Sequence, residues 1–92
     1  MKSTDKPIVL SHHAKEQCTH RGCTEQEIVE AIQMAPWKPA ELGRLECRKV
    51  FSFNGEWNGR RYASKEVRPI FAEETAQLVV VTVYVYYQQG GG

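Results

Sequence analysis

A histidine beside a predicted helix start is the residue of this chain best suited to acid–base chemistry. His13 follows Ser11, which occupies an N-cap position, so its imidazole lies near the N–H groups of a first turn. An imidazole titrates near neutral pH, and a helix start favours a bound phosphate. Cleavage of RNA without metal needs a base, an acid and a cation, and His13 can be the base or the acid. The alternative is a ring that only caps or packs there.

A hydroxyl and a phenol are paired near the C-terminus. Thr82 and Tyr84 are two residues apart within a β-branched and aromatic run, so a strand there places both on one face. Together they can point into a cleft. The alternative is that both side chains only pack within the sheet.

Positive charge is concentrated in residues 44–68. This segment has a local charge of +4, in a chain whose net charge is only +1. Trp57 and Tyr62 are interleaved with the cations, a combination suited to single-stranded nucleic acid. The predicted nucleic-acid contacts are Arg48, Lys49, Trp57, Arg60, Arg61, Lys65 and Arg68. One contiguous positive face is expected from Arg48, Lys49, Arg60, Arg61 and Lys65. The alternative is a solvated strand face whose cations prevent edge-to-edge pairing.

The cysteines do not form a clear metal motif. Cys18 and Cys23 flank His20 in a C-x4-C spacing, and Cys47 is remote. Structural zinc sites usually have closer pairs and four ligands, whereas a cysteine on a helix face is usually a small core residue. We therefore predict no metal and no cofactor. The odd cysteine count, and an N-terminus without an uninterrupted apolar stretch, favour the cytoplasm.

One small domain must position these residues. The 92 residues are 41% hydrophobic and 25% charged, which predicts a single globular domain over 1–92. We expect an ordered core over about residues 7–87 and a flexible tail over 88–92. Residues 12–21 predict a first helix, ended by a glycine. Thr24 and Glu27 form a capping box, which predicts a second helix that stops before Pro36.

The remaining chain predicts β-structure. Residues 7–10 are β-compatible, and apolar and polar residues alternate over 45–53. Two Asn-Gly dipeptides follow, which predict a wide hairpin end. A strand over 65–72 contains Pro69, which needs an edge, a bulge or an unpaired position. Residues 78–87 are apolar on both faces and predict a central strand.

This order of elements predicts an α+β fold. A short N-terminal strand and two helices are expected to pack on one face of a three- to four-stranded antiparallel sheet. The longest apolar run, 78–87, is about half as long as a membrane-spanning helix requires. We therefore predict no membrane insertion.

Four short motifs occur in a fixed order: S-H-H-A at 11–14, R-G-C-T at 21–24, E-I at 27–28 and V-T-V-Y at 81–84. Together they resemble the family known as domain of unknown function 4258, and the resemblance covers nearly the whole chain. That family is similar in fold to RelE/ParE toxins. The resemblance implies a RelE-like domain with an RNA-cleaving or RNA-binding surface on its sheet.

The resemblance also suggests a catalytic set. His13, Arg21, Thr82 and Tyr84 match the family motifs, with His13 as acid or base, Arg21 on phosphate, and Thr82 or Tyr84 assisting. Gln17 departs from the pattern, because family members often carry arginine there. The resemblance therefore implies that this chain lacks one phosphate-binding cation of the pattern.

Three functions follow from these patterns. The first is a bacterial, toxin-like, metal-independent endoribonuclease acting through His13 with Arg21. The second is a non-catalytic module that binds RNA or a protein through the basic, aromatic sheet face. The third is an interaction protein that pairs through an exposed strand, either with a second copy or with an antitoxin-like partner, using the Pro69 strand, Tyr86 and Tyr87.

Overall fold

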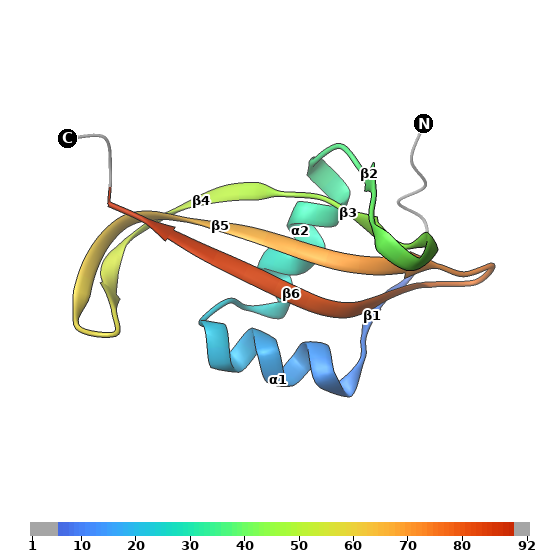
Figure 1. Cartoon of the computed structure of the whole chain (residues 1–92), viewed down its shortest axis with the longest axis horizontal. Helices are drawn as coiled ribbons and strands as arrows, with labels where there is room; N and C mark the ends of the chain where they lie inside the picture. The colour runs from blue at the N-terminus through green and yellow to red at the C-terminus, as the bar shows by residue number, and fades with distance from the viewer. Residues whose placement is uncertain (1–5, 90–92) are drawn as a thin grey trace.

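The computed structural model describes residues 6–89 as two helices packed on a six-stranded mixed sheet (Figure 1). The α+β prediction is confirmed. The helices are α1 (His12–Arg21) and α2 (Glu25–Met34), and η1 (Glu41–Gly43) is a short 3-10 turn. The strands are β1 (Ile8–Leu10), β2 (Lys38–Pro39), β3 (Leu45–Glu46), β4 (Lys49–Trp57), β5 (Arg60–Glu73) and β6 (Leu78–Gln88).

The sheet has more strands than the sequence predicts, and one pair is parallel. Its order is β1-β6-β5-β3-β2, with β4 also beside β5. β1 pairs in parallel with the start of β6, so that Ile8 lies opposite Leu78, and every other pair is antiparallel. β2 has two residues, which is too short for a period-2 pattern to reveal it, and the strand predicted over 45–53 is interrupted at Cys47 and Arg48, which separates β3 from β4. The parallel pairing is a tertiary contact, because both helices and strands β2 to β5 lie between β1 and β6 in the sequence.

Both helices begin and end as local sequence chemistry predicts. The Ser11 hydroxyl accepts from the Ala14 N–H at 3.1 Å, and Gly22 ends α1 at φ 84°. Thr24 and Glu27 form the predicted reciprocal capping box at the start of α2. These caps fix the residues at which the helices begin and at which α1 ends.

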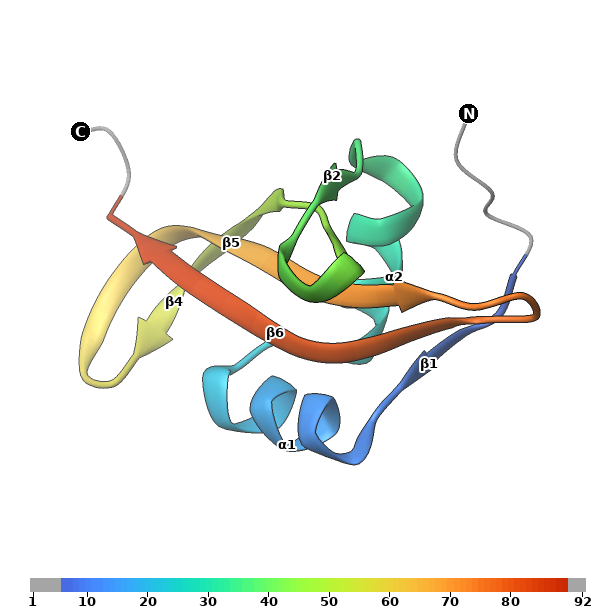
Figure 2. The ribbon, with the colours of Figure 1, turned by 45° about the vertical axis from the view of Figure 1, so that its right-hand side comes forward.

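The helices bury one face of the sheet (Figure 2). In β5, Val67, Pro69 and Phe71 point to this face and are fully buried, while the residues between them are half-buried on the other face. Ile28 and Ile32 of α2 pack in the same cluster. The opposite face of β5 and β6 is therefore left for polar side chains.

The hairpin between β4 and β5 corrects the expectation of a wide end. Trp57 pairs with Arg60 across a two-residue turn, in which Asn58 has φ 52° and Gly59 has φ 79°. Two positive φ values in sequence are the signature of a tight primed turn. The other dipeptide, beginning at Asn54, lies at a register shift within the β4–β5 pair. One Asn-Gly therefore makes the turn and the other a bulge.

Pro69 lies opposite Val83 of β6, and the missing N–H falls on its other side. Its carbonyl accepts from the Cys47 N–H at 3.4 Å, in the interval between β3 and β4 where the neighbouring strand is interrupted. At the C-terminus, Gln88 belongs to β6 although it was assigned to the tail. Gln89 follows the strand and is exposed, and residues 90–92 lie outside the described residues.

Candidate functional site

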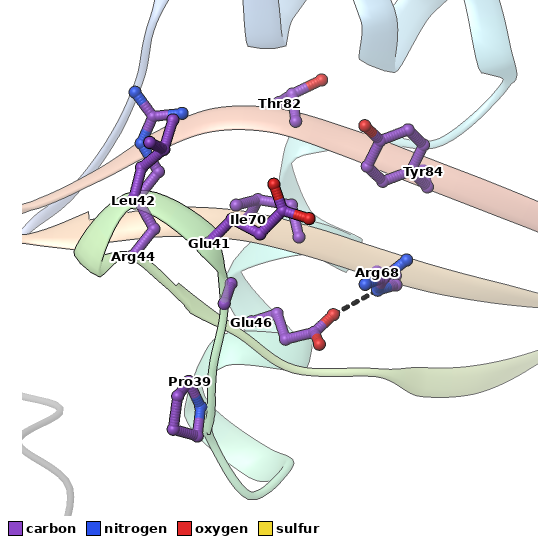
Figure 3. Close-up of a pocket in the computed structure, with 10 residues that line it drawn as sticks. Pro39, Glu41, Leu42, Arg44, Glu46, Arg68, Ile70, Thr82 and Tyr84 are labelled. Atoms are coloured by element: carbon purple, nitrogen blue, oxygen red, sulfur yellow. Dashed lines mark hydrogen bonds and ion pairs between the residues drawn. The ribbon is translucent and has the colours of Figure 1, made fainter.

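A groove of about 620 Å³ lies on the face of the sheet that the helices leave open (Figure 3). Strands β5 and β6 form its floor, and the β2–η1–β3 segment forms its wall. Its polar lining consists of Glu41, Arg44, Glu46, Arg68, Thr82 and Tyr84. The groove brings these polar side chains together from both the floor and the wall, which makes it the candidate site.

Strand register places the floor residues together. Arg68 of β5 lies directly opposite Tyr84 of β6, and Ile70 lies opposite Thr82. Directly opposed residues share a face of the sheet and lie about 5 Å apart. Thr82 and Tyr84 therefore do point to one face, and that face is the open one.

Arg68 is held in place by two neighbours. Its Nε donates to a carboxylate oxygen of Glu46 in an ion pair, and its Nη1 donates to the Tyr86 hydroxyl at 3.4 Å. The Glu46 carboxylate, followed by the Tyr86 hydroxyl, raises the pKa of Arg68. The same bond lowers the pKa of Glu46 below its ordinary value. Both groups therefore stay charged, and among residues 6–89 no hydrogen bond uses Nη2 of Arg68.

Tyr84 is in contact with two arginines from different elements. The guanidinium carbon of Arg21 lies 5.2 Å from the centre of the Tyr84 ring, and that of Arg68 lies 5.6 Å from it. Both distances fall in the range of cation–π attraction. The ring thus gathers two cations at one edge of the groove.

Gln17 orients Arg21 toward this ring. Its Oε1 accepts from Nε of Arg21 at 2.6 Å, one helical turn away. The bond leaves both terminal nitrogens of Arg21 without a hydrogen bond among the described residues. Gln17, the residue at which the chain departs from the expected motif, therefore positions the next arginine along the helix.

His13 lies away from this group. α1 runs beside β6, because the Ser11 N–H bonds the Val80 carbonyl at 2.9 Å and the Tyr87 hydroxyl bonds the Arg21 carbonyl at 2.7 Å. His13 is eight residues before Arg21, which is about 12 Å along the helix. It is exposed, does not line the groove, and makes no hydrogen bond or ion pair within residues 6–89. The structure brings Arg21, Thr82 and Tyr84 to the groove region and leaves His13 outside.

The expected contiguous positive face is wrong. Lys65 is only 5% exposed and bonds Glu27 and the Gly22 carbonyl, each at 2.9 Å. Lys49 pairs with Glu30 of α2 at 3.7 Å. Strand alternation turns both lysines to the helix side, where acidic residues of α2 neutralise them.

The remaining predicted contacts are scattered. Arg48 precedes β4, whereas Arg60 and Arg61 follow its far end, a separation of about 30 Å for a strand of this length. Trp57 stacks on Tyr87 with ring centres 5.2 Å apart, so part of its ring surface is already covered. Of the predicted cations, Arg68 alone lines the groove.

Sequence reasoning missed the wall of the groove. No predicted element covers residues 37–43, yet Glu41 projects from this segment and Arg44 follows it. Leu42, at φ 60°, and Gly43, at φ 72°, bend the segment over the sheet. The only available signal was the concentration of charge in a short Pro- and Gly-containing stretch.

Within residues 6–89, no group of three or more histidine, cysteine or acidic side chains is placed to hold a metal ion. Cys18 and Cys23 are buried against each other, and His20 is exposed. Neither described helix is long and apolar enough to cross a membrane. Comparison of the chain with protein-family models, with curated proteins and with solved structures gave no match.

Proposed function

We propose that this protein is an RNA-binding module that holds a phosphodiester at the groove, beside Tyr84. The observation that carries the proposal is a pair of guanidinium groups that contact the same tyrosine ring. One comes from Arg21 in helix α1 and the other from Arg68 in strand β5. Each retains N–H donors that no described residue uses. Guanidinium forks match phosphate oxygens, and two forks at one place bind one phosphate or two adjacent phosphates.

Neighbouring hydroxyls favour RNA as the ligand. Thr82 and Tyr84 line the groove, and neither hydroxyl makes a hydrogen bond within residues 6–89. Ribose 2′-hydroxyls donate and accept, so such groups are suitable partners for them. Glu41 also lines the groove, and its carboxylate repels phosphate, which restricts the anion to the Arg21 and Arg68 side.

Binding without cleavage is the form of the proposal that this geometry supports. The acid–base candidate His13 does not line the groove, and a general acid or base must come within hydrogen-bond reach of the atom it serves. The resemblance to RelE-like toxins supports an RNA ligand, while the place of His13 argues against the ribonuclease that the same resemblance implies.

Fluorescence anisotropy with a short labelled single-stranded RNA tests the proposal. Affinity should fall steeply between low and physiological salt, because phosphate contacts release counterions. Arg21→Gln should weaken binding by about tenfold and reduce the salt slope by about one. Arg61→Gln removes the same charge from an exposed site on β5 outside the groove, and should change affinity less than about threefold. Equal effects of the two variants, or no binding at low salt, would contradict the proposal.

A cleavage assay tests the non-catalytic part separately. The same RNA is incubated with the protein in EDTA, and the products are resolved on a gel. We expect intact RNA with the wild type. Cleavage that disappears in His13→Ala, with the circular dichroism spectrum unchanged, would establish the ribonuclease instead.

A further inference from the structure

Two thiols are in contact where α1 ends. Sγ of Cys18 and Sγ of Cys23 lie 3.1 Å apart, and neither cysteine is in a disulfide. Their exposed fractions are 4% and 7%, so protein atoms surround the pair on most sides. A disulfide needs sulfur atoms about 2.0 Å apart, so a movement of about 1 Å closes the bond.

The backbone of the helix end creates this contact. The N–H groups of Gly22 and Cys23 both donate to the Cys18 carbonyl at 3.0 Å, and Gly22 adopts the left-handed conformation. In this type of helix end, the side chain just before the final turn touches the side chain just after the glycine. Apolar residues usually make that contact, and here both are cysteines.

The sheet holds the turn from outside. Nζ of Lys65 donates to the Gly22 carbonyl at 2.9 Å, and the Tyr87 hydroxyl donates to the Arg21 carbonyl at 2.7 Å. Both bonds anchor the chain between the two cysteines to the sheet, through the buried Lys65 of β5 and the half-buried Tyr87 of β6. The thiols are therefore kept side by side in the folded protein.

We propose that Cys18 and Cys23 are a modification site, at which the folded protein forms an intrachain disulfide with a low-molecular-weight disulfide such as oxidised glutathione. This inference does not depend on RNA binding. One cysteine thiolate attacks a reagent sulfur and releases one reagent thiolate. The second cysteine thiolate attacks the protein sulfur of the mixed disulfide and releases the other. The two cysteines lose two electrons and two protons, and the reagent disulfide becomes two thiols.

Burial affects the rate of this step. Desolvation raises the pKa of both thiols, which keeps them protonated at neutral pH. The attacking species is the thiolate, so we expect slow oxidation at pH 7 and faster oxidation as the pH rises.

Tryptic mapping identifies the bond directly. Trypsin cuts after Arg21, between the two cysteines, so Cys18, Cys23 and Cys47 fall in three peptides, residues 16–21, 22–44 and 45–48. The full chain is equilibrated with a reduced and oxidised glutathione buffer, quenched in acid, alkylated, denatured and digested without reductant. We expect peptides 16–21 and 22–44 to be joined, and 45–48 to be alkylated.

The same equilibrium in urea is the control for native geometry. We expect the equilibrium constant for the Cys18–Cys23 bond to be at least tenfold larger in the folded chain than in urea. In Cys23→Ala, Cys18 should carry only glutathione. An equal or smaller constant in the folded chain, links to peptide 45–48, dimers, or glutathione adducts alone on the wild type would each overturn the proposal.

Discussion

The two faces of the sheet are built from the same strands, but the charged residues on them differ in burial and in how completely their partners enclose them. On the helix side, Lys65 is almost completely buried and is neutralised by Glu27 and a backbone carbonyl. On the open side, Arg68 is paired with Glu46 yet keeps a quarter of its side chain exposed beside a groove. A cation enclosed by its partners supports the fold, whereas a cation with an exposed donor can also meet a ligand.

Period-2 alternation explains the division. Neighbouring residues of one strand point to opposite sides, so Lys65 and Arg68 have different surroundings although they are three residues apart. The sum of charge over a segment therefore says little about any one surface. Variants that change adjacent residues on the two faces test this difference most directly.

The largest effect is expected for Phe71→Ala. Phe71 is fully buried on the helix side and packs edge-on against Trp37 with ring centres 5.0 Å apart. Its truncation should lower the free energy of unfolding by about 3–5 kcal/mol. The matched variant Ile70→Ala, on the open face, should cost less than about 1.5 kcal/mol because that side chain is only half-buried. Urea unfolding followed by circular dichroism measures both, and equal losses would show that the faces do not differ in this way.

Gly22→Ala is expected to have the next largest effect. A Cβ at Gly22 would overlap the Tyr87 hydroxyl and come within 2.6 Å of the Trp57 ring, and φ is 84°. Steric overlap together with the left-handed conformation should cost about 2–4 kcal/mol. Gly43→Ala has a similar φ, 72°, but no atom within 4 Å, and should cost only about 1 kcal/mol. A Gly22→Ala loss no greater than the Gly43→Ala loss would remove packing as the cause.

Local sequence signals predicted the elements of this fold well. Ser11, Gly22, Thr24 and Glu27 act at the helix ends as their chemistry indicates. These devices work through neighbours in the chain, so the sequence contains all the information they need. The parallel pairing of β1 and the two-residue strand β2 depend on distant contacts and left no local pattern.

The site was only partly predictable for the same reason. Spacing alone placed Thr82 and Tyr84 on one face. The partner of each cation depends on tertiary structure. Packing of the helices on the sheet pairs Lys65 with Glu27 of α2 and places Arg21 against the Tyr84 ring. A sequence pattern gives the face of a residue but not the element that covers that face.

A smaller, pH-dependent effect is expected for Glu46→Gln on the open face. Its pairing with Arg68 lowers the pKa of Glu46 from 4.5 in the folded state. A lowered pKa contributes stability that is present above about pH 4.5 and is lost as the pH falls through the folded value. The variant should therefore be less stable by about 1–2 kcal/mol at pH 7, and the difference should shrink below pH 4.5.

Urea unfolding of both proteins from pH 7 to pH 3 measures this convergence. Glu56→Gln is the matched control, because Glu56 is exposed on β4 and has no ion pair within the described residues. The control should differ from the wild type by less than about 0.5 kcal/mol at each pH. A Glu46→Gln difference that stays constant with pH would mean that the lost contact is not ionic.

The smallest effect separates two adjacent tyrosines at the end of β6. The Tyr87 hydroxyl, on the helix side, donates to the Arg21 carbonyl at 2.7 Å, whereas the Tyr86 hydroxyl, on an exposed residue, only accepts from Arg68 at 3.4 Å. Tyr87→Phe leaves a part-buried carbonyl without this donor and should cost about 1 kcal/mol, while Tyr86→Phe should change stability by less than about 0.5 kcal/mol. Thermal and urea unfolding of the two variants, side by side, decide the matter. If the two losses are equal, the hydroxyl of Tyr87 does not anchor the end of α1, and Arg21 must be held beside Tyr84 by Gln17 and the ring alone.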